Sequence, residues 1–221
     1  MSNQWSALRL GSELYHQLES RDHYYNDYLR DIKKWDRWED ADQLGRSDMV
    51  PLIGFLNQWR SRYEDSSETR ERLLDTIRHV LPVGTAFKGL DLLSIDLDGD
   101  IAQIASTPGE VIGRVFDAIA LAQGKKHSTV ASKIMHTMNP ELFIMWDEKI
   151  CAGYALDDRD GSDYADRFLR RMQQLARSSG KSNFACGHPM AKVVDEYNYV
   201  KFTLARDEIW DAERRREAHR T

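Results

Sequence analysis

The chain has 221 residues, a formal net charge of −5, 41% hydrophobic residues and 30% charged residues. This length suits one large domain or two small ones, and the hydrophobic content can form a substantial core, so we expect disorder only at the ends. The mild acidity argues against a general nucleic-acid coat protein, although a local basic face on an acidic body is compatible with it.

The chain lacks the sequence features of a secreted or membrane protein. No apolar stretch is long enough to span a bilayer, and the first residues do not have the pattern of a signal peptide. The two cysteines, Cys151 and Cys186, are too few for a disulfide framework or a four-cysteine site. We therefore predict a cytoplasmic protein with no membrane partner.

Apolar residues recur every three or four positions along the first half of the chain, which predicts helices. We expect them over Tyr24–Trp35, from an N-cap at Ser47 to Trp59, and through Leu73–Val80, where Pro82 ends the helix. Residues 83–106 are rich in glycine and aspartate, so we predict turns and no strand there.

The clearest helix start in the chain is the sequence Thr107-Pro108-Gly109-Glu110. Thr107 can cap the helix, Pro108 suits its first position, and Glu110 can complete a capping box. We expect this helix to end near Gly124, and the next to begin with Ser128 as its N-cap.

The remaining sequence also predicts packed helices. A helix that ends at Asn139-Pro140 is followed by an apolar connection and by Asp147, which can cap another helix. Helical spacing returns over 164–175 and 193–204. We predict one all-α domain over 1–206, in which 1–82 can form an N-terminal subdomain and 107–206 the core, and a charged helix over 207–221.

Several polar clusters invite a metal site but fit polar turns better. The acidic segment 157–163 has Leu156 where an EF-hand loop needs its first ligand. Cys186 and His188 have no partner cluster at ligand spacing, and the aspartates over 96–100 are typical of a turn. The chain contains no Walker loop, GxGxxG, GxSxG or HExxH motif. We expect no metal and no cofactor.

The segment from His127 to Asp147 has the most distinctive layout. A capped helix carries Lys133 in its first turns, the helix ends at Asn-Pro, and an aspartate opens the next helix. Lys125, Lys126 and His127 gather at the helix N-terminus, where unpaired amides and the helix dipole favour a phosphate.

This layout resembles the catalytic core of the helix-hairpin-helix DNA glycosylases, especially the 8-oxoguanine glycosylase branch, mainly over residues 107–154. Lys133 matches the family's lysine, and Asp147, fourteen residues later, matches its aspartate. The family's glycine-rich hairpin is replaced here by residues 123–128, which contain one glycine, and the iron–sulfur cysteines of some branches are absent.

The resemblance implies a monomeric, helix-hairpin-helix-like DNA N-glycosylase that removes a modified or damaged base, in DNA repair or in phage defence. Asp147 stabilises the oxocarbenium character at the sugar C1′, and Lys133 either attacks C1′, which adds AP lyase activity, or grips a phosphate. The base pocket is expected to contain Trp146, Phe143, His136 and Tyr154, and the DNA phosphates are expected to contact Lys125, Lys126 and Ser128.

Each of these residues also has a purely structural interpretation. Phe143 and Trp146 are suited to a core, Asp147 can be only a helix cap, Lys133 only an exposed lysine and His136 only a packed histidine. Two alternative functions therefore stay open: a non-catalytic helical module that binds nucleic acid or a protein, and a nucleotide- or toxin-related enzyme with different chemistry.

Overall fold

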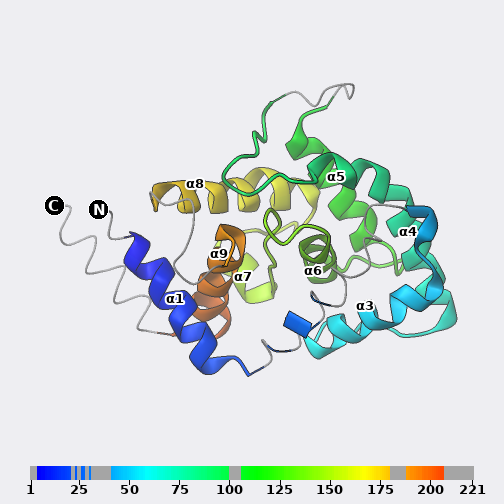
Figure 1. The fold of residues 1–221 in the computed structure, drawn as a ribbon, viewed down its shortest axis with the longest axis horizontal. Helices are drawn as coiled ribbons and strands as arrows, with labels where there is room; N and C mark the ends of the chain where they lie inside the picture. Colours follow the sequence, from blue (N-terminus) through cyan, green and yellow to red (C-terminus); the bar gives the residue numbers. More distant parts are fainter. Residues whose placement is uncertain are drawn as a thin grey trace.

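The structure, a computed structural model, describes residues 4–20, 41–99, 106–179 and 188–206, together with residues 23, 26, 27 and 30. Throughout these residues the fold is all-α and contains no strand, as predicted (Figure 1). The predicted helix over 24–35 lies mostly outside the described residues. Cys186 and the charged helix predicted over 207–221 lie wholly outside them.

The structure describes eight α-helices, two short 3-10 helices and two π-helical segments. The α-helices are α1 (Gln4–Leu18), α3 (Arg46–Gln58), α4 (Ser67–Gly84), α5 (Pro108–Ala120), α6 (Ser128–Met138), α7 (Glu148–Gly153), α8 (Arg170–Ser178) and α9 (Met190–Asn198). Two short 3-10 helices are η2 (Ala41–Gln43) and η3 (Thr85–Phe87). Two π-helical segments, η4 (Asp163–Leu169) and η5 (Tyr199–Thr203), are continuous with α8 and α9, respectively.

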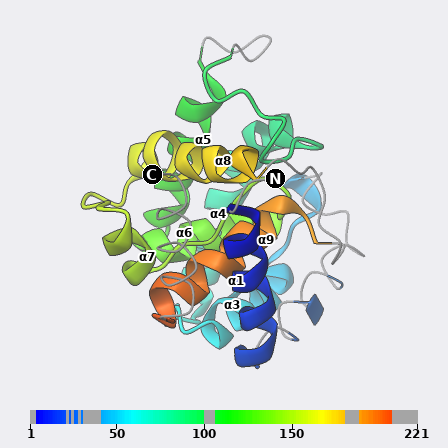
Figure 2. The same cartoon turned by 90° about the vertical axis from the view of Figure 1, so that its left-hand side faces the viewer.

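The helices pack around a hydrophobic core that includes residues from Ala7 to Val200. Helix α1 lies along α9, so the first and last described helices are neighbours, as Figures 1 and 2 both show. Helix α5 packs against both α4 and α6, and α7 packs against η5. The core is thus built from segments that are far apart in the sequence.

The predicted start of α5 is confirmed in detail. The Thr107 hydroxyl accepts a hydrogen bond from the Glu110 amide at 3.3 Å, and the Glu110 carboxylate accepts one from the Thr107 amide at 3.0 Å. Pro108 occupies the first helical position. In the turn that follows α5, Gly124 has a φ of 78°, a conformation that glycine adopts without strain.

The predicted cap at Ser47 is wrong, because α3 begins earlier. Gly45 is the N-cap residue, and its amide donates a hydrogen bond to the Asp48 carboxylate at 2.8 Å. Sequence favoured Ser47 because its hydroxyl can cap, but the aspartate three residues beyond the glycine satisfies this helix end instead.

Two further predicted helix boundaries are also wrong. Ser128 is the first residue of α6, and the cap residue is His127, which makes no side-chain capping bond. Pro82 does not end α4, which continues to Gly84. Proline removes one amide donor but has helical φ, so a helix can pass through it within its last turn.

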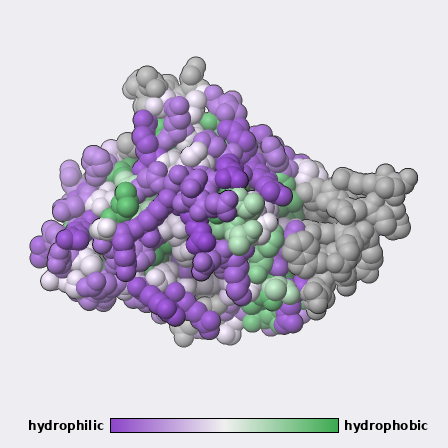
Figure 3. Space-filling view, turned by 180° about the vertical axis from the view of Figure 1, so that it is seen from behind, coloured by the Kyte–Doolittle hydropathy of each residue, from purple (hydrophilic) through white to green (hydrophobic). Residues whose placement is uncertain are grey.

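The face seen in Figure 3 is mostly hydrophilic, with hydrophobic residues in small patches. Leu18, Val50 and Leu121 are the large apolar side chains that are exposed in the described part of the chain. Among the described residues, every helix is too short or too polar to cross a lipid bilayer.

Two glycines set the contact between α5 and η4. The backbones of Gly113 and Gly161 approach so closely that a Cβ atom on Gly161 would overlap the Gly113 carbonyl group. Because this neighbour is backbone, a larger residue cannot be accommodated by a change of rotamer. This contact helps to position η4, whose Tyr164 and Phe168 rings pack against Trp146.

We predict that Gly161→Ala lowers the free energy of unfolding by about 2 kcal/mol or more, because the helices must move apart. Gly54→Ala in α3 is the matched control, since nothing lies within 4 Å of the added Cβ. The control should stabilise the protein by roughly 0.5–1 kcal/mol. Urea unfolding measures both, and equal effects of the two substitutions would contradict the close contact.

Candidate functional site

A cavity of about 280 Å³ lies between α1, α6, α9 and the segments that precede α4 and α7. Both predicted catalytic residues, Lys133 and Asp147, line it. The other charged lining residues are Arg60, Glu148 and Asp195, and the aromatic ones are Tyr15, Trp59, Trp146 and Tyr199. The fold therefore brings the predicted pair into one cavity, together with two further carboxyl groups and three aromatic rings, those of Tyr15, Trp59 and Tyr199, that the sequence did not indicate.

Asp147 caps α7, as predicted, and its position is fixed by two hydrogen bonds. One carboxylate oxygen accepts from the Ile150 amide at 2.9 Å, and the other accepts from the Thr203 hydroxyl at 2.5 Å. Each carboxylate oxygen can accept more than one hydrogen bond, so the group can still act on a ligand in the cavity. Asp147 is thus both a helix cap and a lining residue.

Lys133 is buried, with 7% of its surface exposed. Its ammonium group donates to the Trp59 carbonyl oxygen at 2.7 Å and to the Ser61 hydroxyl at 2.8 Å. The alternative that Lys133 is an exposed helix lysine is therefore wrong. The lysine connects α6 to the segment between α3 and α4.

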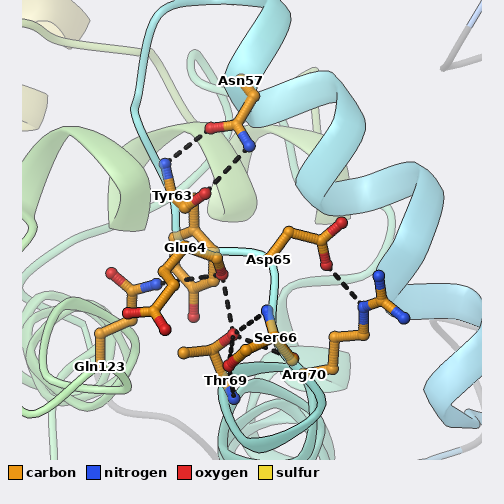
Figure 4. A network of polar contacts seen from close by, with 8 residues as sticks. All are labelled: Asn57, Tyr63, Glu64, Asp65, Ser66, Thr69, Arg70 and Gln123. Atoms are coloured by element: carbon orange, nitrogen blue, oxygen red, sulfur yellow. Dashed lines mark hydrogen bonds and ion pairs between the residues drawn. The ribbon is translucent and has the colours of Figure 1, made fainter.

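That segment is held in place by a network of polar contacts (Figure 4). The Asn57 side chain bonds twice to the Tyr63 backbone, donating to its carbonyl at 3.0 Å and accepting from its amide at 2.6 Å. The Thr69 hydroxyl lies 2.8 Å from the Glu64 carbonyl and accepts from the Ser66 amide at 2.9 Å. These contacts fix the loop that carries both hydrogen-bond partners of Lys133.

The same loop contains two residues in the left-handed region. Arg60 and Arg62 have φ values of 58° and 51°, on either side of Ser61. Non-glycine residues adopt this conformation at some energetic cost, and such strain often accompanies functional sites. These two residues flank Ser61, which contacts Lys133, and one of them, Arg60, lines the cavity.

Asp195 on α9 is the most unusual residue of the site. It is 4% exposed and lines the cavity, yet its carboxyl group makes no hydrogen bond or ion pair with another residue of the described part of the chain. Burial raises the pKa of Asp195 to about 7. Lys192 and Lys133 oppose this rise, whereas the charges of Glu196 and Asp147 add to it.

A second buried cluster lies on the same helix. The ammonium group of Lys192 is 3.6 Å from a carboxylate oxygen of Glu196 and 4.6 Å from the centre of the Tyr15 ring. The Ser12 hydroxyl donates to Glu196 at 2.5 Å. This cluster anchors α1 on α9 and sets the position of Tyr15 at the cavity.

Trp146 alone of the predicted base-pocket residues lines the cavity. Its indole N–H donates to the Ser128 carbonyl at 3.1 Å, and its ring packs edge-on against Phe116 and Tyr164, with centroids 5.4 and 5.1 Å away. It is 1% exposed, so it is also a core residue, as its structural interpretation proposed.

The structure places the other predicted pocket residues away from this cavity. His136 is buried, its Nδ1 lies 2.5 Å from the Phe143 carbonyl, and burial lowers the pKa of its imidazole to about 3. It is therefore a neutral histidine packed in the core. Phe143 packs edge-on against Phe87, and the Tyr154 hydroxyl donates to the Asn198 side chain at 2.7 Å.

The predicted phosphate-binding residues lie at the turn between α5 and α6. Lys125 and Lys126 are exposed, and the Lys126 ammonium donates to the Asp158 carbonyl at 2.7 Å. Ser128 begins α6 one residue before Thr129, which lines the cavity. Whether these residues bind phosphate stays a prediction.

The predicted polar turns have internal partners. Asp98 forms two hydrogen bonds with Arg170, at 2.6 and 2.8 Å, and Asp163 pairs with Arg167 at 2.5 Å. In the part of the chain that the structure describes, no group of three or more His, Cys, Asp or Glu residues could hold a metal ion.

The most informative residue that sequence reasoning missed is Asp195. It follows Val194 on a helix that was expected to be packed, and the whole of α9 is buried. The same helix also carries Lys192 and Glu196, so the sequence offers no pattern that distinguishes Asp195 from the charged residues beside it. Tyr15, Trp59 and Tyr199 gave no signal either, because aromatic residues at helical spacing are ordinary core residues.

Comparisons of the chain with protein-family models, with curated proteins and with solved structures found no significant match.

We predict that Asp195→Asn stabilises the protein increasingly as pH rises from about 4 to about 7. The pKa of the wild-type carboxyl group is higher in the folded protein than in the unfolded chain. Over this pH range the unfolded chain has therefore lost the proton while the folded protein still holds it, and the free energy of unfolding falls as the pH rises. The asparagine variant lacks this loss, which amounts to at most about 1.4 kcal/mol per pH unit. Urea unfolding at several pH values measures the difference. Asp157→Asn, at an exposed site, is the control. A difference that does not change with pH would contradict the burial of an unpartnered carboxyl.

Proposed function

We propose that this protein is a DNA N-glycosylase-like enzyme that removes a modified or damaged base. The observation that carries the proposal is the lining of one cavity by Lys133 and Asp147, a pair identified from the sequence alone. The order along the chain of the helices that carry them also agrees with the resemblance to the helix-hairpin-helix family. The lysine lies on the second helix of the packed α5–α6 pair, and the aspartate caps the helix that follows.

The chemistry suits a half-buried carboxylate at this position. As the N-glycosidic bond breaks, positive charge develops at C1′ and on the ring oxygen of the sugar, and a fixed anion stabilises it. The Ile150 amide and the Thr203 hydroxyl hold Asp147 in one orientation before the substrate arrives. The carboxylate can also orient and deprotonate the water that attacks C1′.

The volume of the cavity suits a single base better than a larger ligand. At about 280 Å³ it is at the small end of ligand pockets, which usually exceed 300 Å³. The rings of Tyr15, Trp59 and Tyr199 offer apolar and stacking surface. A base that has left the duplex stack needs such surface to offset the loss of its stacking neighbours.

Exposed basic groups supply the phosphate contacts in this proposal. Arg60 lines the cavity, Arg62 is exposed two residues later, and Lys125 and Lys126 are exposed in the turn that follows α5. Local basic groups can contact phosphates even though the net charge of the chain is −5, because salt screens the more distant acidic groups.

We assign the nucleophile to water and a positioning role to Lys133. To attack C1′, Lys133 would have to lose a proton and break its hydrogen bonds to Trp59 and Ser61. In its observed place it holds the 59–61 segment, and with it Trp59 and Arg60, against the cavity. This choice corresponds to base removal without an AP lyase step.

An abasic-site assay over DNAs with oxidised, alkylated, deaminated and hypermodified phage bases tests the proposal. The wild type should leave abasic sites in at least one of these DNAs. Asp147→Asn should lower the single-turnover rate on that DNA by about 100-fold or more while the Tm changes little, because asparagine also caps helices well. The exposed Asp157→Asn variant is the matched control and should keep the wild-type rate.

Three results would overturn parts of this proposal. Full activity of Asp147→Asn would remove the assigned carboxylate. A protein–DNA adduct trapped by borohydride in the wild type and absent in Lys133→Ala would make Lys133 the nucleophile. DNA binding with no abasic site in any DNA would identify a binding module instead of an enzyme.

A further inference from the structure

We propose that Asp195 is a second catalytic carboxyl group, a general acid that protonates the base as it leaves. This inference rests on the proposed function and extends it. Of the three carboxyl groups that line the cavity, it gives two different tasks: Asp147 acts on the sugar as an anion, and Asp195 acts on the base as a proton donor.

The geometry of the cavity separates the two carboxyl groups by environment. Asp147 lies at the start of α7, is partly exposed, and accepts two hydrogen bonds, one from an amide and one from a hydroxyl. Asp195 comes from α9, is 4% exposed, and receives no hydrogen bond at its carboxyl group from any described residue. A pair of acids in such contrasting surroundings is the usual arrangement for acid and base roles in one site.

A purely structural role does not account for Asp195. A buried carboxyl group without a partner costs stability, because it has lost its contact with water and gained nothing in exchange. The neighbouring buried carboxylate, that of Glu196, is by contrast paired with Lys192 and Ser12. Asp195 differs in facing a cavity, where a ligand can supply the missing partner.

The pKa of Asp195 is suited to a group that donates a proton at neutral pH. Its pKa of about 7 leaves a substantial protonated fraction, and a general acid is most effective when its pKa is near the working pH. The titratable and charged groups that face it are Lys192 and Glu196 on α9, Lys133 on α6, Asp147 and Glu148 at α7, Arg60 before α4, Tyr15 on α1 and Tyr199 on η5.

The proposed step is a balanced hydrolysis. The Asp195 hydroxyl gives its proton to a ring nitrogen of the base, the C1′–N bond breaks, and its electron pair remains on the base. Water forms the new bond to C1′ and gives a proton to Asp147. Asp147 then releases that proton to solvent, and Asp195 takes one up, so the enzyme returns to its starting state.

Paired DNA substrates that differ only in how readily the base leaves test this role. An electron-withdrawing substituent on the base lessens its need for a proton. Asp195→Asn should slow removal of the poorer leaving group by about 100- to 10,000-fold and that of the better one much less. The wild-type rate should fall above about pH 7, and the variant should lack this dependence. Asp147→Asn should slow both substrates alike.

The outcomes separate this inference from the function on which it rests. If the wild type makes abasic sites but Asp195→Asn slows both substrates equally and keeps the wild-type pH profile, the acid role is overturned and the glycosylase proposal stands. If the wild type makes no abasic site in any DNA, both are overturned. Melting curves of each variant show whether a lost rate reflects a lost fold.

Discussion

Removing a charged side chain from water is costly, and this chain does so repeatedly where α6 and α9 enter the core. Lys133 is compensated by the Trp59 carbonyl and the Ser61 hydroxyl, and Glu196 by Ser12 and Lys192. Lys192 and Glu196 are one turn apart on α9, whereas the Ser12 bond and both Lys133 bonds join segments that are distant in sequence. The packing of α1 on α9, and of the 59–66 loop on α6, is therefore linked to the burial of charge. Asp195 is the exception, because its carboxyl group lines the cavity without a hydrogen bond from another described residue.

The aromatic residues around the cavity depend on the same constraint. Lys192 lies over the Tyr15 ring, Tyr15 packs edge-on against Tyr199 at 5.8 Å, and Tyr199 in turn packs against Trp59. Tyr199 begins the π-helical segment η5, and Thr203 ends it. Both residues line the cavity, in keeping with the frequent occurrence of π-helical turns at functional sites. The π-helical segment η5 thus carries both the Tyr199 ring and the Thr203 hydroxyl that holds Asp147.

Features of the site that depend on local chemistry could be predicted from the sequence. The Thr107 capping box and the Asp147 cap need only residues within one helical turn, and both are present. Lys133 and Asp147 lie on either side of one short connection, so a local motif was enough to bring them together. Ser128 and Pro82 show the limit of such patterns, since hydroxyls do not always cap and proline does not always end a helix.

The rest of the site is assembled by tertiary packing. Tyr15 comes from the first described helix, Asp195 from the last, and Trp59 from the loop between α3 and α4; no sequence spacing relates them. His136 shows the converse, because it belongs to the motif segment but points into the core. The charge role of Asp147 is measured by the affinity for DNA with a cationic 1-azaribose abasic site, compared with a neutral tetrahydrofuran site in the same sequence. The protein should bind the cationic site about 100-fold more tightly, and Asp147→Asn should lose this preference. Equal affinity for the two sites would contradict this role.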